Sequence, residues 1–184
     1  MAAFTAMNLV VVTQPLGVMT LPTVLVAFGA NMLGGLAPDL DQPTAKIWNG
    51  IRGGGVLGKL ISPLLGGHRF ISHSILGIFL FGYLADFLLN KLSQVLLVDM
   101  VVVWWTFMIG YVSHLVMDTL TQEGVPWLFP IPIRLGFPPL KFLRIKTGGI
   151  VEKSFVFPGL LALNGYIFYT YYGRYLELLK KYVS

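Results

Sequence analysis

The sequence predicts an all-helical integral membrane protein, a bundle of about four transmembrane helices joined by loops that lie at the membrane interface. Of its 184 residues 55% are hydrophobic and 11% are charged, and the mean hydropathy is +0.75. Because soluble domains carry about 25% charged residues, this composition places the chain in a bilayer. We find no internal repeat and no low-complexity tract, so residues 1–184 are expected to form a single membrane-embedded domain.

Four apolar stretches approach the length of about 20 residues that a helix needs to cross a bilayer. They run from about Leu16 to Leu36, Ser74 to Leu92, Val95 to Leu115 and Phe155 to Tyr172. The first contains Pro22 and several glycines, which predict close helix packing or a kink. The second and third are separated by so few residues that we expect them to form a helical hairpin.

Two long connections, residues 39–72 and 122–153, are rich in glycine and proline. Their apolar residues, such as Ile61 and Trp127, favour segments that lie at the membrane interface. Residues 1–12 are apolar but too short to span a bilayer alone. They also lack the positively charged start and the cleavage site of a signal peptide.

The charge and the absence of cysteine limit the possible chemistry. The net charge is +5, but no basic run with interleaved aromatic residues stands outside the apolar stretches, so nucleic-acid binding is not expected. In a membrane protein, excess lysine and arginine indicates loops on the cytoplasmic side. Without cysteine, any bound metal must be held by nitrogen and oxygen ligands.

Alternating helix directions bring the polar residues of the chain to one membrane face. The first stretch ends near Asp39, the second starts near His73, the third ends near Asp118 and the fourth starts near Glu152. Nine of the 13 lysines and arginines lie on that face as well. The positive-inside rule therefore predicts that the polar residues lie at the cytoplasmic surface.

Six of these residues are candidate metal ligands. They are Asp39, Asp41, His68, His73, His114 and Asp118. His114 and Asp118 stand four residues apart at the end of an apolar helix, so they project from one face and can share an ion. All three histidines of the chain are expected at the same membrane face.

Each of these motifs also has a structural interpretation. His114 and Asp118 can form a hydrogen bond that closes a helix. Asp39 and Asp41, which lie between two prolines, can belong to a turn that ends a helix. Glu152 can complement the dipole of the helix that follows it. The metal interpretation rests on the convergence of all the motifs at one face, since no single motif requires it.

Three strings of residues resemble the YdjM-like membrane-bound metal-dependent hydrolases. They are Pro38-Asp39-Leu-Asp41-Gln-Pro43, Gly67-His68-Arg69-Phe-Ile-Ser-His73-Ser74 and Gly110-Tyr-Val-Ser-His114-Leu-Val-Met-Asp118 with its continuation to Pro130. Their order and spacing match from about residue 20 to 160, with Glu152 in the family's late acidic position. The resemblance implies a protein of the bacterial or archaeal inner membrane with a divalent-metal hydrolase site.

The chain departs from this family in two places. Family members usually have a Thr-His or Gly-His pair at the head of an extra helix, and many have His where Gln42 stands. Residues 1–12 resemble the tail of that helix without its His. We therefore expect the natural gene product, or a close relative, to extend upstream with a His near the start of a complete first helix.

The sequence thus predicts a metal-dependent hydrolase that cleaves an ester or phosphoester of a lipid, or of another substrate at the lipid bilayer. The six ligands would hold one or two ions of Zn, Mn or Fe, since mixed imidazole and carboxylate ligands suit all three. Arg69 would hold a phosphate oxygen and Glu152 would take a proton. The alternatives are a metal-binding or metal-transporting protein without hydrolysis, and a scaffold whose metal site is structural.

Overall fold

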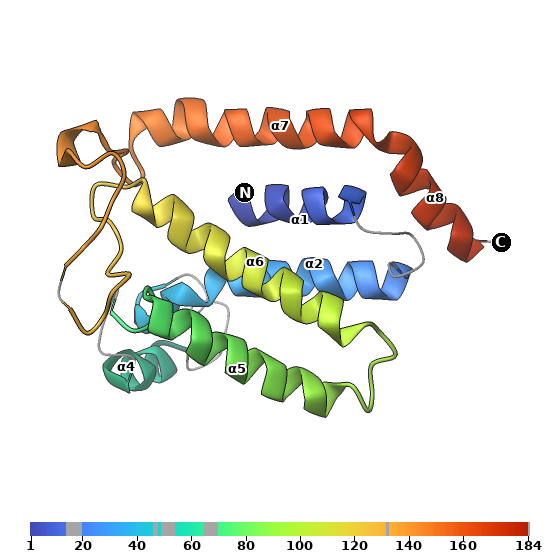
Figure 1. Cartoon of the computed structure of the whole chain (residues 1–184), viewed down its shortest axis with the longest axis horizontal. Coiled ribbons are helices and arrows are strands. Elements are labelled where there is room, and N and C mark those ends of the chain that lie inside the picture. Colours follow the sequence, from blue (N-terminus) through green and yellow to red (C-terminus); the bar gives the residue numbers. More distant parts are fainter. Residues whose placement is uncertain (14–19, 46–47, 49–53, 65–69, 132, 184) are drawn as a thin grey trace.

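A computed structural model of the chain describes residues 1–13, 20–45, 48, 54–64, 70–131 and 133–183. Helices account for the regular structure of this part, and the strand-like pairing within it is limited to two isolated bridges. The α-helices are α1 (Ala2–Thr13), α2 (Leu21–Leu36), α4 (Gly54–Leu64), α5 (Ile75–Leu92), α6 (Met100–Thr119), α7 (Phe157–Thr170) and α8 (Tyr172–Val183) (Figure 1). The shorter elements are the 3-10 helices η1 (Pro38–Asp41) and η2 (Lys141–Leu143) and the π-helix η3 (Glu152–Val156). The predicted all-helical class is confirmed for these residues.

Polar side chains fix where the bundle helices begin. The hydroxyl of Thr20 accepts the Thr23 N–H at the start of α2, and the hydroxyl of Ser74 accepts the Gly77 N–H at the start of α5. Asp99 caps α6 by accepting the N–H groups of the next turn at 3.0 and 3.1 Å. This cap starts the helix at Met100, later than the predicted Val95, and the helix runs on to Thr119.

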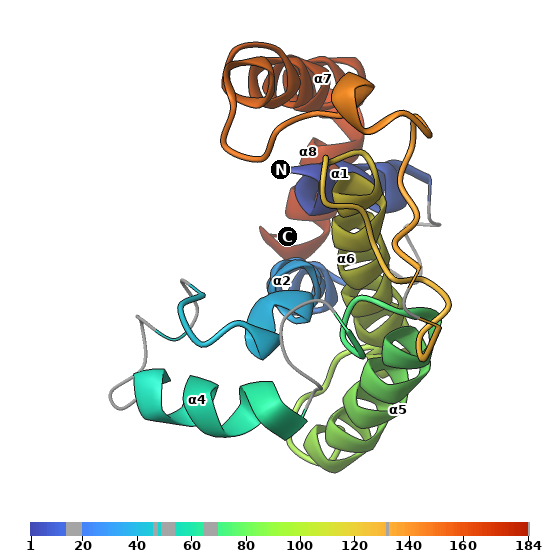
Figure 2. The ribbon, with the colours of Figure 1, turned by 90° about the vertical axis from the view of Figure 1, so that its left-hand side faces the viewer.

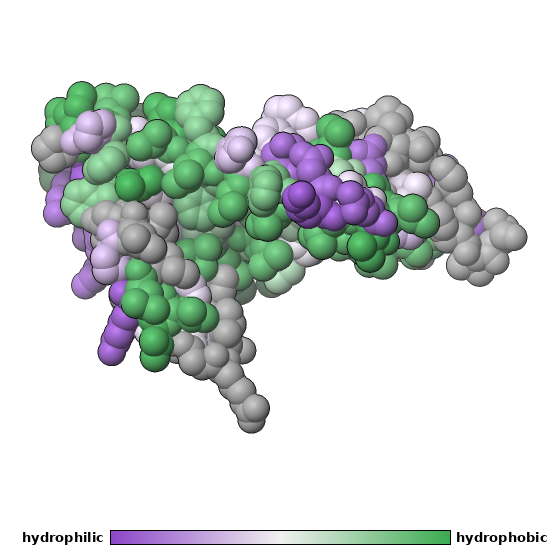
Figure 3. All heavy atoms as spheres, turned by 90° about the horizontal axis from the view of Figure 1, so that it is seen from below, coloured by the Kyte–Doolittle hydropathy of each residue, from purple (hydrophilic) through white to green (hydrophobic). Residues whose placement is uncertain are grey.

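Two helices of the described chain, α5 with 18 residues and α6 with 20, are long and apolar enough to cross a membrane. The other two predicted spans are shorter, since α2 has 16 residues and α7 has 14. At 1.5 Å per residue, 16 residues rise about 24 Å, less than the roughly 30 Å of a hydrocarbon core. Four spans therefore remain an expectation. Figure 3 shows a face that is largely hydrophobic, with hydrophilic side chains in a few patches.

The helix directions alternate as the sequence predicts. In Figure 1, α2 and α6 run toward the left and α5 and α7 start at the left, whereas α1 begins nearer the middle of the view. We call this the site end of the bundle, because Asp39, His73, Asp118 and Glu152 all lie there. Figure 2 looks onto the site end and shows α7 end-on but α4 lengthwise, so α4 lies across the bundle. That orientation suits a segment at the membrane interface.

The tightest contact in the bundle is the crossing of α2 over α6, where two glycines allow the backbones to touch. A Cβ added to Gly34 would lie 2.0 Å from the carbonyl oxygen of Phe107, and one added to Gly110 would lie 2.1 Å from that of Asn31. The buried Asn31 side chain donates to the Thr106 carbonyl at 2.9 Å. Small residues and buried amides of this kind are what hold helices together in lipid.

A buried polar network holds α7 and α8 against α1. Asn8 donates to the Asn164 side-chain oxygen at 2.7 Å, and Asn164 donates to the Thr5 hydroxyl at 2.7 Å. The Tyr175 hydroxyl donates to Asn8 at 3.0 Å. Because each of these buried groups has a partner, the network links the three helices without leaving an unsatisfied donor or acceptor among the atoms named. It thereby keeps the start of α7 near the start of α1 at the site end.

The helix crossing yields a first prediction. Gly110→Ala should lower the free energy of unfolding by about 1–3 kcal/mol, because the new methyl group overlaps the α2 backbone. Gly29→Ala is the matched control: nothing lies within 4 Å of an added Cβ there, and alanine favours a helix by up to about 1 kcal/mol. Thermal unfolding in detergent, followed by circular dichroism, separates the two. Equal effects of both substitutions would show that the crossing is not tightly packed.

Candidate metal centre

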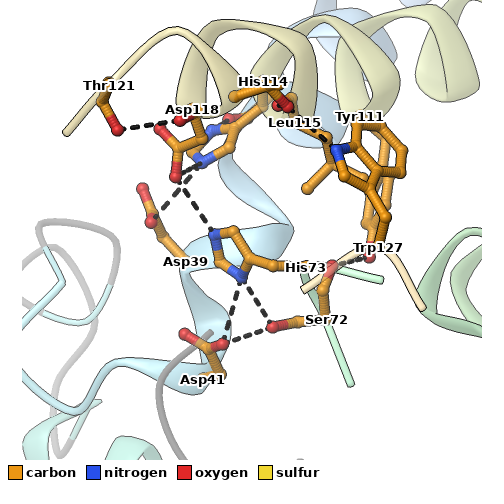
Figure 4. Close-up of polar contacts among 12 residues, drawn as sticks. Asp39, Asp41, Ser72, His73, Tyr111, His114, Leu115, Asp118, Thr121 and Trp127 are labelled. Carbon is orange, nitrogen blue, oxygen red and sulfur yellow. Dashed lines mark hydrogen bonds and ion pairs between the residues drawn. The ribbon is translucent and has the colours of Figure 1, made fainter. Parts of the chain in front are cut away.

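Four side chains from three segments converge at the site end (Figure 4). Asp39 comes from η1, His73 from the turn before α5, and His114 and Asp118 from the last turns of α6. The Nε2 atom of His114 lies 3.7 Å from Asp39 Oδ1 and 3.8 Å from Asp118 Oδ2. His73 Nε2 lies 3.6 Å from the same Asp118 oxygen. We call these four residues the His-Asp cluster.

The spacing within the His-Asp cluster fits a shared ion better than direct hydrogen bonds. Nitrogen-to-oxygen hydrogen bonds span about 2.7–3.2 Å, shorter than these distances. Two ligands that each lie about 2.1 Å from a tetrahedral ion are separated by about 3.4 Å. One donor atom from each of Asp39, His73 and His114 falls within 4.8 Å of the other two. The distances between the donor atoms of the cluster are therefore compatible with a bound metal ion.

The ring of His114 is oriented by the backbone of α2. Its Nδ1 lies 2.8 Å from the carbonyl oxygen of Gly35, which can only accept, so Nδ1 carries the proton and donates it. The Nε2 atom then holds a lone pair directed at the cluster. This atom is buried and makes no hydrogen bond to the described residues. A histidine whose second nitrogen is fixed by a carbonyl is the usual geometry of a metal ligand.

The ring of His73 is oriented by an acidic residue behind it. Its Nδ1 lies 2.9 Å from the Ser72 hydroxyl oxygen and 3.3 Å from Asp41 Oδ2, and the Ser72 hydroxyl donates to Asp41. His73, Ser72 and Asp41 are fully buried. The structure thus places Asp41, predicted as a ligand, on the Nδ1 side of His73, where it faces away from the cluster. A carboxylate in this position holds the imidazole and raises its basicity as a ligand.

Contacts from α6 and from the loop after it hold the segment that carries His73. Tyr111 lies one helical turn before His114, on the same face of α6. Its hydroxyl donates to the Ser72 carbonyl. The Ile75 N–H donates to the Trp127 carbonyl at 3.0 Å, and the Trp127 indole donates to the Thr119 hydroxyl at 3.0 Å. Sequence reasoning missed Tyr111, although its spacing of three residues from His114 was a usable signal.

A cavity of about 290 Å³ opens beside the cluster. It lies between the start of α1, the end of α6 and the start of α7, and its walls include Ala2, His114, Asp118 and Glu152. Glu152 is half-buried, and its Oε2 accepts the Gly148 N–H at 2.6 Å. The predicted late carboxylate therefore shares a cavity with two members of the cluster.

The remaining site predictions fall on the loop before α5. His68, a predicted ligand, and Arg69, a predicted phosphate-binding residue, lie outside the described residues. Their assignments stay predictions. Asp39, His73, His114 and Asp118 are the predicted ligands that the structure brings together.

The geometry yields a second prediction. The purified protein should carry a divalent metal, and His114→Ala or Asp118→Asn should remove most of it, because each deletes a cluster donor. Asp41→Asn should weaken metal affinity by about 10- to 100-fold, as loss of a residue that orients a ligand does. Asp86→Asn is the matched control, since Asp86 lies within α5 and accepts from Asn90.

Elemental analysis measures the metal, and circular dichroism checks that each variant keeps its helices. Equal metal content in the wild type, His114→Ala and Asp118→Asn would contradict the assignment of the cluster as a metal centre.

Comparisons with known proteins identify the family. The chain matches the sequence profile of the family described as YdjM inner membrane protein over residues 1–176. It is 32% identical over 156 residues to "Uncharacterized protein YvsG" of Bacillus subtilis (strain 168), a match that covers 83% of this chain and 84% of that protein. No solved structure matches the chain. The resemblance of its sequence motifs is thereby confirmed, and the chain belongs to the YdjM inner membrane protein family.

Proposed function

We propose that the protein is a metal-dependent hydrolase that cleaves an ester or phosphoester of a membrane-associated substrate. The observation that carries this proposal is the His-Asp cluster, which faces a cavity at the site end. A structural metal site is closed by its protein ligands, whereas a catalytic one keeps a position open to substrate. The Asp39 side chain is 35% exposed and that of Asp118 is 14% exposed, so water can approach the cluster.

The ligand set proposed here is smaller than the one expected from the sequence. Asp39, His73, His114 and Asp118 would hold the ion, while Asp41 orients His73 through its Nδ1 side. Because four protein ligands fill a tetrahedral site, hydrolysis requires a fifth coordination position for water on the cavity side. Two imidazoles with two carboxylates suit Zn, Mn and Fe. His68 stays a predicted ligand of the same site.

The chemistry divides between the ion and the residues around it. A divalent ion in such a site acts as a Lewis acid and supplies a water-derived nucleophile at neutral pH. Glu152, in the wall of the same cavity, would take a proton from the attacking water on the carboxylate oxygen that is not bound to the Gly148 N–H. It would return this proton to the alkoxide that leaves when the ester bond breaks. Arg69 keeps its predicted role of holding a phosphate oxygen.

The position of the cluster favours hydrolysis over metal transport. Transporters place their ion sites near the middle of the membrane, often where helices are broken. The His-Asp cluster lies instead at the site end, where η1, the turn before α5 and the end of α6 meet (Figure 4). An end position lets a substrate reach the ion from the membrane surface.

We place the site end at the cytoplasmic face of the membrane, because positive residues gather there. Within the described chain these are Lys59, Arg134, Lys141, Arg144, Lys146 and Lys153, against Lys91, Arg174, Lys180 and Lys181 toward the other end. Family membership supports the inner membrane itself.

The third prediction tests this orientation with single cysteines, since the chain has none of its own. Leu97 is 95% exposed in the turn between α5 and α6, and Leu140 is 55% exposed at the site end. An impermeant thiol reagent should label Leu97→Cys in intact cells but label Leu140→Cys only after lysis. The reverse labelling pattern would place the site end at the face of the membrane opposite the cytoplasm.

The fourth prediction concerns activity. Detergent-solubilised protein, incubated with phospholipids and polyprenyl phosphates in the presence of Zn or Mn, should release a hydrolysis product that mass spectrometry detects. A chelator and Asp118→Asn should both abolish turnover, because each removes the ion. Asp86→Asn should leave it unchanged.

Assays of the wild-type protein also test the alternative function, metal transport. Absence of product from every substrate, together with metal uptake into proteoliposomes, would replace the hydrolase proposal with the transporter.

A further inference from the structure

A second hollow runs along α6 beside the cavity of the metal centre. This groove has a volume of about 590 Å³, and its floor is formed by α6 side chains that include Trp105, Ile109 and Val112. Ala6 of α1 and Ile78 of α5 contribute to its walls. The three helices therefore border a shallow groove that is largely open on its outer side.

The groove is chemically apolar. The Ser113 hydroxyl donates to the Gly110 carbonyl of its own helix at 2.8 Å. The Trp104 indole N–H donates to the Gly82 carbonyl at 2.9 Å. The Ser113 hydroxyl and the Trp104 indole N–H are thus already used within the bundle, and the groove offers an occupant an almost entirely apolar surface. Such a surface selects an apolar occupant.

The groove and the metal-centre cavity lie next to each other. Ala2, Ser113 and Met117 line both of them. From Met117 to Trp105 the groove follows α6 for 12 residues, which is about 18 Å at 1.5 Å per residue. Because α6 is long enough to cross a membrane, this path leads from the site end in the direction that lipid chains take.

We propose that this α6 groove binds one hydrocarbon chain of a membrane lipid whose headgroup lies in the cavity beside the His-Asp cluster. The role given to the cavity rests on the proposed hydrolase function, whereas the groove itself stands on its own lining. The arrangement matches an amphiphile: a cavity lined in part by His114, Asp118 and Glu152 at one end, and about 18 Å of apolar groove leading from it. Substrate selection then depends on the chain as well as on the bond that is cleaved.

Photolabelling tests the groove without requiring activity. The probe is a phospholipid that carries a diazirine near the end of one acyl chain, added to the detergent-solubilised protein. Peptide mapping should find the label on α6 between Trp105 and Val116, and Val112→Trp should remove it by filling the groove. Leu25→Trp is the control, since Leu25 is 64% exposed on α2 and does not line the groove.

Two labelling results would overturn the proposal that the groove binds a lipid chain. One is equal labelling of α6 and of the α2 surface around Leu25. The other is labelling that survives Val112→Trp. Ala6→Leu narrows the groove from the α1 side and should also reduce the label. This second variant keeps the test valid if Val112→Trp fails to fold.

Kinetics then links the groove to the metal centre. Val112→Trp should lower kcat/KM for a long-chain phospholipid, relative to that for soluble bis(4-nitrophenyl) phosphate, by about 10-fold or more, the effect of losing a few methylene contacts in a pocket. An unchanged ratio would overturn the groove as a substrate site. If the wild type labels in the groove but hydrolyses neither compound, the proposed function fails and the lipid site remains.

Discussion

The crossing of α2 over α6 is the contact on which the His-Asp cluster depends. Gly34 and Gly110 let the two backbones touch, and no larger residue fits at either position without moving a helix. Asp39 lies in η1, which follows α2, and His114 lies one turn beyond Gly110, so the crossing sets the distance between these two candidate ligands. The Gly35 carbonyl that orients His114 is brought into place by the same contact. Packing and chemistry are therefore coupled through a few small residues.

Each histidine ring of the cluster has a hydrogen-bond partner at its Nδ1 atom. A buried imidazole or carboxylate is costly unless it has a partner. Asp41 and Ser72 satisfy one side of His73, and the Gly35 carbonyl satisfies one side of His114. Both rings then direct their other nitrogen toward the carboxylates of the cluster at distances that suit an ion. The cavity and the apolar groove beside this arrangement share lining residues. The polar side chains of the cluster therefore lie next to the groove that we propose for a hydrocarbon chain.

The sequence predicted the helical class, the alternation of helix directions and the meeting of His114 with Asp118, because these follow from hydropathy and helical spacing. It did not predict that Asp41 lies behind His73, since that depends on how η1 packs against the turn before α5. The start of α6 was placed too early because the apolar stretch extends back to Val95, whereas the Asp99 side chain caps the helix and starts it at Met100. The contribution of α1 to the cavity wall was also missed, because its residues there are alanines with no chemical signature.

The most direct measurement is a metal-loaded crystal structure with anomalous scattering at the metal edge. We predict an ion bonded through Nε2 of both His73 and His114 and through carboxylate oxygens of Asp39 and Asp118, at about 2.0–2.2 Å. Asp41 should stay outside the coordination sphere, on the Nδ1 side of His73. Two results would contradict the assignment of the cluster as a metal centre. One is an ion that neither histidine binds, and the other is a site end whose side chains form direct hydrogen bonds and exclude the ion.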